Sequence, residues 1–385
     1  MTRLFKPLRG TAAALLLAAL LLPGLAANHA AAANQFADPA FQTVWTRTDA
    51  LVGQNGITRG YFWGPQPGFS LQEAYKEGAG GKRLVQYFDK SRMEINNPNA
   101  DKSSKFYVTN GLLTVELISG RMQNGNNDYQ YRWSAQIDLA SDADDASAPT
   151  YASFQNLMYQ ADSRIGENAT YTINRIGGVG NDASKASDPG TVIAYYEPAT
   201  KHNIPKVFWD FLNQTGPVMD GGKRVNERLN DPWFYATGYP IAEPYWASVK
   251  IAGQANTAVM IQPYERRVLT YVPSAPAAYK VQMGNIGQHY YDWRYNNAGK
   301  PVFDPATCEV VPTKGIGKVW ADHPEVQQEL GCTYQSSPYN VQVAQQQFEH
   351  GQMIDIIISD TYNGKTYSYK TIYVLFDDGT VQRFE

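Results

Sequence analysis

Gln262-Pro263-Tyr264-Glu265-Arg266-Arg267-Val268-Leu269 is one of three related octets in this chain of 385 residues. The other two are Gln86-Tyr87-Phe88-Asp89-Lys90-Ser91-Arg92-Met93 and Gln346-Gln347-Phe348-Glu349-His350-Gly351-Gln352-Met353. Their shared pattern is Gln, any residue, an aromatic residue, an acid, a base or His, two free positions, and then Met or Leu. A pattern that recurs along a chain is typical of a module used several times rather than of a single active site.

Each octet predicts a β-hairpin. Strand-forming residues stand on both sides of a polar centre, and the aromatic residue and the final Met or Leu are placed to pack across the two strands. The predicted four-residue turns are 89–92, 265–268 and 349–352, with the acid and the base facing water. A glycine precedes each octet, and these glycines are Gly64, Gly238 and Gly331.

The hairpins predict an α+β fold that is β-rich, with three related hairpin-containing units, short helices and an inserted β segment. The expected boundaries are 34–122 for the first unit, 123–200 for the insert, 201–297 for the second unit and 298–385 for the third. Polar loops that separate short strand-like runs mark the insert. Residues 203–212 predict the best helix, with Asn203 as its cap. A chain of this length exceeds one ordinary hydrophobic core, which also favours several domains.

Residues 1–33 have the pattern of a signal peptide. A basic start precedes the apolar run 12–22, and small residues then offer cleavage sites between about 26 and 33. The run is shorter than the roughly 20 residues that a membrane-spanning helix needs. The sequence therefore predicts a chain that is secreted or held at the cell surface, with no membrane span after cleavage. An uncleaved N-terminal anchor is the alternative.

Composition narrows the class of partner. The leader holds three of the 33 bases and none of the 36 acids, so cleavage would leave 30 bases against 36 acids. This mildly acidic balance disfavours nucleic acid as a partner, which requires a basic face. The high aromatic content, 13% against 18% charged residues, together with 32 Gly and 22 Pro, is typical of a β-rich exported protein with many turns.

Cys308 and Cys332 are the two cysteines of the chain. In an exported protein they predict a disulfide, which by the loop-entropy model would contribute about 3 kcal/mol. Two free thiols or a metal pair are the alternative, but no His or Cys stands at ligand spacing from them. The acidic run at 142–145 could bind Ca²⁺, although a solvated loop explains it more simply because the EF-hand glycine and distal Glu are missing. We therefore predict no metal and no cofactor.

The segment Gly238-Tyr239-Pro240-Ile241-Ala242-Glu243, followed by Gln-x-Tyr-Glu-Arg at 262–266, resembles the LGFP repeat of bacterial cell-wall-associated proteins. The third unit looks similar but lacks the proline, and the first has Gly64-Pro65 without the intervening aromatic residue. The whole chain is also similar to a group of exported bacterial proteins that carry segments like 284–291. The resemblance implies a role at the cell surface or wall, and it carries over no catalytic residue.

The run His289-Tyr290-Tyr291-Asp292-Trp293-Arg294-Tyr295 is the strongest candidate for a binding site. If the run is extended, the residues at 289, 291, 293 and 295 share one face. Such a face could stack on sugar rings, with Asp292 or Arg294 available to bind hydroxyls or carboxylates. Tyr291, Trp293 and Arg294 are therefore the predicted ligand contacts. The alternative is a buried aromatic face that seals the second unit.

The predicted function is a non-enzymatic, exported, cell-surface or cell-wall-associated module that binds an envelope glycan or a surface protein, with several units acting together. A secreted hydrolase with its site between units or in the insert is one alternative, and an extracellular scaffold for protein partners is another. We assign no catalytic residue. The recurring acids Asp89, Glu265 and Glu349 could form a glycosidase pair, but a catalytic acid is unique, whereas these recur beside a base in every octet.

Overall fold

The computed structural model describes residues 35–300 throughout, and then 308, 311, 314–323, 327, 333, 342–362, 365–376 and 381–384. The chain divides into two compact units, Met1–Lys300 and Pro301–Glu385. The predicted leader, 1–33, and Cys332 lie outside the described residues, so the leader and the Cys308–Cys332 disulfide stay predictions. The first two octets lie within the first compact unit, and the third lies in the second.

Two sheets, one antiparallel and one mixed, organise the first compact unit. The four-stranded sheet has the order β1 (Ser70–Ala74), β2 (Lys82–Phe88), β3 (Ser91–Ile95), β4 (Thr109–Asn110). The six-stranded sheet has the order β16 (Val281–Met283), β15 (Val268–Tyr271), β14 (Gln254–Pro263), β13 (Tyr245–Ile251), β7 (Tyr171–Ile173), β8 (Val179–Asn181). Strands β7 and β8 come from the predicted insert, and β7 joins the sheet through its parallel pairing with β13.

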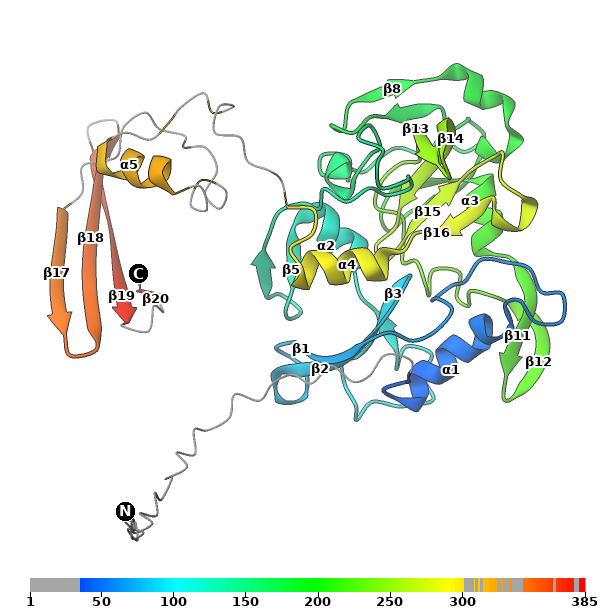
Figure 1. Ribbon diagram of the computed structural model, residues 1–385, viewed down its shortest axis with the longest axis horizontal. Helices are drawn as coiled ribbons and strands as arrows, with labels where there is room; N and C mark the ends of the chain where they lie inside the picture. The colour runs from blue at the N-terminus through cyan, green and yellow to red at the C-terminus, as the bar shows by residue number, and fades with distance from the viewer. Residues whose placement is uncertain are drawn as a thin grey trace, which may run out of the picture. The chain divides into compact units, whose positions relative to one another are not determined.

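Three two-stranded ribbons complete the strands of this unit: β5 (Arg121–Gln123) with β6 (Tyr129–Tyr131), β9 (Ile193–Glu197) with β10 (His202–Pro205), and β11 (Thr215–Asp220) with β12 (Lys223–Arg228). Its α-helices are α1 (Pro39–Thr48), α2 (Leu113–Ser119), α3 (Lys206–Leu212) and α4 (Ile286–Tyr295) (Figure 1). Short 3₁₀ turns occur at Asp49–Leu51, Ala79–Gly81, Tyr151–Phe154, Ala183–Ser187, Pro189–Thr191 and Ala277–Tyr279. The predicted α+β, β-rich class is confirmed, and the three-unit organisation stays a prediction.

Local chemistry explains where these helices begin and end. The Asp38 side chain accepts a hydrogen bond from the Ala40 N–H at 2.8 Å, and Pro39 occupies the first helical position of α1. Helix α2 ends at Gly120, whose φ of +71° suits the left-handed cap. Helix α3 begins later than predicted because Asn203 belongs to strand β10 and pairs across the ribbon with Tyr196, so it is not the cap.

All three octets form antiparallel hairpins, as predicted. Strand β2 pairs with β3, β14 pairs with β15, and in the second compact unit β17 (Gln342–Phe348) pairs with β18 (Gly351–Tyr362). In the first two hairpins the octet aromatic residue and the final Met or Leu are buried together in one core cluster. In the third hairpin the corresponding Phe348 and Met353 are 48% and 39% exposed, so this hairpin does not bury the same pair.

The turns are shorter than the predicted ones at 89–92, 265–268 and 349–352. Phe88 pairs with Ser91 and Phe348 with Gly351, which leaves two residues between the strands. In the octet at 262–269 the Tyr264 N–H donates to the Arg267 carbonyl at 2.8 Å, which also leaves two residues between the strands. The sixth octet residue already pairs across the hairpin in each case. Two-residue turns prevail in hairpins because their twist matches that of the flanking strands.

The first octet residue has the same structural role in both hairpins of the first compact unit. The Gln86 amide donates to the Gly68 carbonyl at 3.1 Å, and the Gln262 amide donates to the Ala242 carbonyl at 3.1 Å. Each acceptor lies four residues beyond the glycine that precedes the octet. Both glutamines are fully buried, so each amide ties its hairpin to the incoming chain where water cannot compete.

The glycines that precede these octets pack directly against the octet acids. A Cβ atom on Gly238, which has a φ of +69°, would lie 2.5 Å from Glu265 Oε2, and one on Gly64 would lie 3.2 Å from the Asp89 nitrogen. The residue before each glycine accepts a hydrogen bond of 2.9 Å from the N–H of the octet base. The glycine and the octet therefore act as one structural element, although many residues separate them in sequence.

The two hairpin turns also contact the helices of each other's segment. The Asp89 carbonyl accepts hydrogen bonds from the N–H groups of Gly287 and Gln288 in α4, at 3.0 and 3.2 Å. The Glu265 carbonyl accepts one from the N–H of Val115 in α2, at 3.4 Å. Helix α2 follows the first hairpin and α4 follows the second. Each turn thus satisfies N–H groups at the start of the other segment's helix, where no intrahelical acceptor exists.

The second compact unit consists of helix α5 (Lys314–Asp322) and a four-stranded antiparallel meander of β17, β18, β19 (Lys365–Phe376) and β20 (Val381–Phe384). The β18–β19 hairpin is the longest pairing, and it runs in unbroken register from Gly351–Phe376 to Tyr362–Lys365. Across the described ranges of both units, no helix combines the length and the apolar character needed to cross a membrane.

The contact between Gly238 and Glu265 gives a first testable prediction. Gly238→Ala should lower the free energy of unfolding by about 1–2 kcal/mol for the left-handed conformation, and further because the new Cβ would displace Glu265. Gly222→Ala is the matched control, since Gly222 has a φ of +78° with nothing within 4 Å of the new Cβ. Urea unfolding followed by tryptophan fluorescence measures both. Equal losses in the two variants would show that the contact is unimportant.

Candidate functional site

The predicted binding run at 289–295 lies on helix α4 and is not extended, so the strand interpretation was wrong. Ile286, Tyr290 and Trp293 are fully buried, and their spacing of four and three residues is that of one helical face. This spacing was present in the sequence and could have identified the helix. In a helix the residues at 291 and 295 share a face, while Trp293 points elsewhere.

Trp293 is a core residue in this structure. Its ring is 0% exposed, and its Nε1 donates to the Trp133 carbonyl at 3.0 Å. The ring therefore offers no face to a ligand in this conformation. Replacing it by alanine would cost about 3–5 kcal/mol of stability.

Arg294 belongs to a buried network of charges beneath α4. Its side chain is 7% exposed, its Nη1 donates to the Tyr290 hydroxyl at 3.0 Å, and its Nε lies 3.8 Å from Glu73 Oε1. Arg92 Nη1 lies 3.1 Å from Glu73 Oε2. The remaining members are Arg83, Glu94 and Glu116, so the network balances three arginines against three glutamates.

The pKa values of two carboxyl groups in the network are shifted in opposite directions. Burial alone would raise the pKa of Glu73, but the charges of Arg92, Arg294 and Arg83 outweigh it and lower the pKa from 4.5 to about 2. Burial raises the pKa of Glu116, and Arg92 and the Tyr290 hydroxyl offset it only in part. Both side chains are almost fully buried, so this difference concerns stability and not chemistry on a substrate.

Tyr291 is the predicted contact that does reach the surface, where it joins Phe69 and Tyr295 in what we call the aromatic strip. The Phe69 and Tyr291 rings stack at 5.9 Å, and the Tyr291 and Tyr295 rings lie 5.0 Å apart. Phe69 is 45% exposed and Tyr295 is 42% exposed, while Tyr291 between them is half-buried. Sequence reasoning missed Phe69 because it precedes strand β1, more than 200 residues from α4.

The buried charge network contacts the aromatic strip through Tyr295. The Tyr295 hydroxyl donates to Glu73 Oε1 at 2.8 Å, and the guanidinium of Arg294 lies 5.7 Å from the Tyr295 ring centroid. Tyr87, whose hydroxyl donates to the same Glu73 oxygen at 2.6 Å, contacts Tyr291 edge to face at 5.1 Å. The rings are therefore pre-organised, which lowers the entropy lost when a ligand binds.

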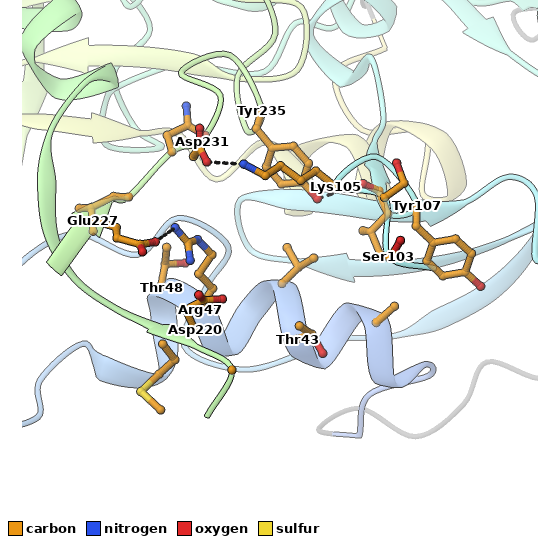
Figure 2. A pocket seen from close by; sticks show the side chains of 18 of the residues that line it. Thr43, Arg47, Thr48, Ser103, Lys105, Tyr107, Asp220, Glu227, Asp231 and Tyr235 are labelled. Carbon is orange, nitrogen blue, oxygen red and sulfur yellow. Dashed lines mark hydrogen bonds and ion pairs between the residues drawn. The ribbon is translucent and has the colours of Figure 1, made fainter. Parts of the chain in front are cut away.

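A concave site lies elsewhere in the same compact unit. Helix α1, the loop 102–108, the β11–β12 hairpin and the segment 229–235 enclose a pocket of about 460 Å³, which we call the α1 pocket (Figure 2). Figure 1 shows α1 beside the β11–β12 hairpin, and α1 and β11 are in contact. None of the predicted ligand contacts lines this pocket.

The acidic residues that were candidates for a glycosidase pair or a Ca²⁺ site have structural partners. Asp89 Oδ1 accepts from the Gln288 amide at 2.8 Å, and Glu265 Oε2 accepts from the Tyr239 N–H at 3.1 Å. Glu349, in the second compact unit, is exposed beside His350. In the 142–145 loop, Asp142 accepts from two backbone N–H groups of the β13–β14 turn. Within the described residues, no group of three or more His, Cys, Asp or Glu could hold a metal ion.

In comparisons with protein-family models, with curated proteins and with solved structures, no match was found. The resemblance to LGFP repeats therefore rests on the motif residues at 238–243 and 262–266.

The contrast between Glu73 and Glu116 gives a second prediction. Glu73→Gln should destabilise the protein by about 3–5 kcal/mol at pH 7, because it removes the carboxylate that pairs with Arg294 and one of the three that surround Arg92. Glu116→Gln should cost much less, because burial already disfavours the charge of Glu116. Urea unfolding at pH 7 measures both.

The lowered pKa of Glu73 also predicts how the stability of the protein depends on pH. The folded pKa of Glu73 is lowered to about 2 from 4.5, so its contribution is complete above about pH 4.5 and is lost as the pH falls towards 2. The difference in stability between the wild type and Glu73→Gln should therefore narrow below pH 4.5. A difference that stays constant between pH 7 and pH 3 would contradict the assigned role of the Glu73 charge.

Proposed function

We propose that this chain is a non-enzymatic, exported, cell-surface or cell-wall-associated module that binds an envelope glycan. The observation that carries the proposal is the aromatic strip, in which Phe69, Tyr291 and Tyr295 lie in a row at the surface. The ligand contact predicted at Tyr291 is kept. Trp293 and Arg294 have structural roles instead, since Trp293 is buried in the core and Arg294 belongs to the buried charge network.

The chemistry of the strip suits sugar rings. Aromatic side chains offer large, rigid apolar faces at low entropic cost, and a sugar ring has an apolar face of C–H groups that can lie on them. Neighbouring rings of the strip are 5.0 and 5.9 Å apart, so successive rings can contact one continuous ligand chain. A row of rings therefore favours an extended polymer over an isolated small molecule.

The position of the strip also favours recognition without rearrangement. Helix α4 is anchored by the Asp89 carbonyl at its first turn and by Trp293 and Tyr290 in the core. Tyr295 is anchored by Glu73. Because α4 and Tyr295 are held in place before binding, less ordering entropy is lost when a ligand contacts the rings.

Export and wall association rest on the leader pattern at 1–33 and on the motif resemblance at 238–243. The three octets suggest that related units act together, and linking several weak contacts raises the overall affinity. An envelope polysaccharide, which repeats its own chemical unit, is the partner that such an arrangement would suit.

A sedimentation assay with isolated bacterial cell walls tests the proposal. The wild type should pellet with the walls, and Phe69→Ala should weaken binding by about tenfold, since it removes one exposed ring without disturbing a polar group. Tyr279→Ala is the control because Tyr279 is 38% exposed and lies outside the strip. Tyr295→Phe keeps the ring and should retain most of the binding.

Circular dichroism would confirm that each variant is folded. Failure of the wild type to pellet, or equal pelleting of Phe69→Ala and Tyr279→Ala, would reject the strip as the glycan site.

A further inference from the structure

The first two octets lie together in one compact unit, whereas the third has no other octet in its own unit. We propose that the third octet hairpin, residues 342–362, pairs with the same hairpin of a second copy of this chain, which gives a dimer with two-fold symmetry. Most soluble oligomers are formed in this way, by one surface patch that contacts its own copy. The inference does not depend on glycan binding, because no residue of the aromatic strip belongs to this hairpin.

The first two octets show what one octet contacts in another. Lys90, the base of the first octet, donates from Nζ to the Met283 carbonyl at 2.6 Å. Arg266, the base of the second octet, donates from Nε to the Asn110 carbonyl at 3.0 Å. Both acceptors occupy the same position, since each pairs across its sheet with the last residue of the octet in its own segment. The base of each octet therefore binds the strand that follows the other octet's hairpin.

The backbone contacts of the two octet turns are reciprocal as well. The Asp89 carbonyl accepts hydrogen bonds from N–H groups at the start of α4, and the Glu265 carbonyl accepts one from an N–H group at the start of α2. Side-chain and backbone contacts thus both run in both directions. In an interface with two-fold symmetry, a residue of one copy contacts a second position and that position contacts the first residue in return. The first two octets are therefore related as two copies are in a symmetric dimer.

The third octet has the same residue types, but they lie at the surface. His350 holds the position of the base, and its side chain is 84% exposed and 3.9 Å from Glu349, the acid of its own octet. Phe348 and Met353 are 48% and 39% exposed, whereas their counterparts in the first two octets are all buried. The groups by which an octet contacts its partner therefore remain available in the third hairpin.

The exposed apolar residues near this turn share one face of the sheet. Phe348 pairs with Gly351, and Gly351 pairs with Phe376 of β19, so both phenylalanines lie on the face of a residue that has no side chain. Met353 lies two residues from Gly351 and therefore on the same face. Phe376 is 37% exposed. Exposed apolar residues that gather on one face are typical of a protein–protein interface.

The charges near the turn suit a second copy of the same hairpin. From residue 342 to residue 354, Glu349 and His350 are the only acid and the only base. Across a two-fold axis the carboxylate of one copy can accept a hydrogen bond from the imidazole of the other, and the reverse contact forms at the same time. The octet is therefore complementary to itself in charge as well as in its apolar face, which favours a second copy over a partner of different composition.

Sedimentation equilibrium of the full chain between about 1 and 100 µM tests the proposal, since the population of a dimer depends on concentration. We expect a mass that rises to twice that of the chain. Phe348→Ser should raise the dissociation constant of the dimer by about tenfold, because it removes an aromatic ring from the contact. Val343→Ser is the matched control, because Val343 is 55% exposed on the same strand but faces the other side of the sheet. It should leave the dissociation constant unchanged.

A photoreactive side chain locates the contact. On irradiation, Met353→p-benzoylphenylalanine should form a covalent dimer that is joined to residues 348–353 of the second copy, as read by mass spectrometry of its peptides. Circular dichroism checks that every variant is folded. A monomeric wild type over the whole concentration range, equal effects of Phe348→Ser and Val343→Ser, or a cross-link to the first compact unit would each overturn the proposal.

Discussion

The carboxylate of Glu73 is the contact on which the described site depends. It is buried on strand β1, yet it accepts hydrogen bonds from Tyr87 on β2 and Tyr295 on α4, and it pairs with Arg92 on β3. One charged group therefore ties three neighbouring strands to a helix from the far end of the compact unit. The arginines around it keep the carboxyl ionised despite its burial, which makes its removal costly.

The reciprocal contacts of the two hairpin turns extend this linkage. Each turn offers a backbone carbonyl to the first turn of the helix that follows the other hairpin, so neither hairpin completes its surroundings alone. The glycine before each octet permits the close approach that these contacts need, because a side chain at Gly238 would meet Glu265. The pattern shared by the first two octets thus meets the structural requirements of an interlocked pair of hairpins.

The aromatic strip and the α1 pocket follow from this architecture in different ways. The aromatic strip is a surface row of rings, and the buried network beneath α4 holds the Tyr295 ring through its hydroxyl. The α1 pocket is concave and is closed by ion pairs between α1, the 102–108 loop and the segment 227–231. An exposed row of rings suits a polymer, whereas the α1 pocket is lined by equal numbers of basic and acidic side chains.

Local patterns in the sequence determined the elements that depend on residues close together in the chain. The octets predict the hairpins because strand-forming residues flank a polar centre, and the fold class follows from their number. The turn length was not predicted, since the pairing of Phe88 with Ser91 depends on register across two strands. Helix α4 was misread because its aromatic residues also fit an extended face, and only the spacing of Ile286, Tyr290 and Trp293 distinguishes the two.

Only the tertiary structure decided which aromatic residues meet the surface. Trp293 and Tyr291 are both aromatic residues of the same short run. Trp293 is buried in the core, whereas Tyr291 stacks on Phe69, which lies far away in sequence. The α1 pocket is likewise formed by four segments that no local pattern connects. Burial and the enclosure of space arise from contacts between distant residues, whereas a sequence pattern reports the preferences of neighbouring ones. The sequence by itself therefore determined the hairpins and the candidate chemistry, and the packing of distant segments decided where that chemistry is exposed.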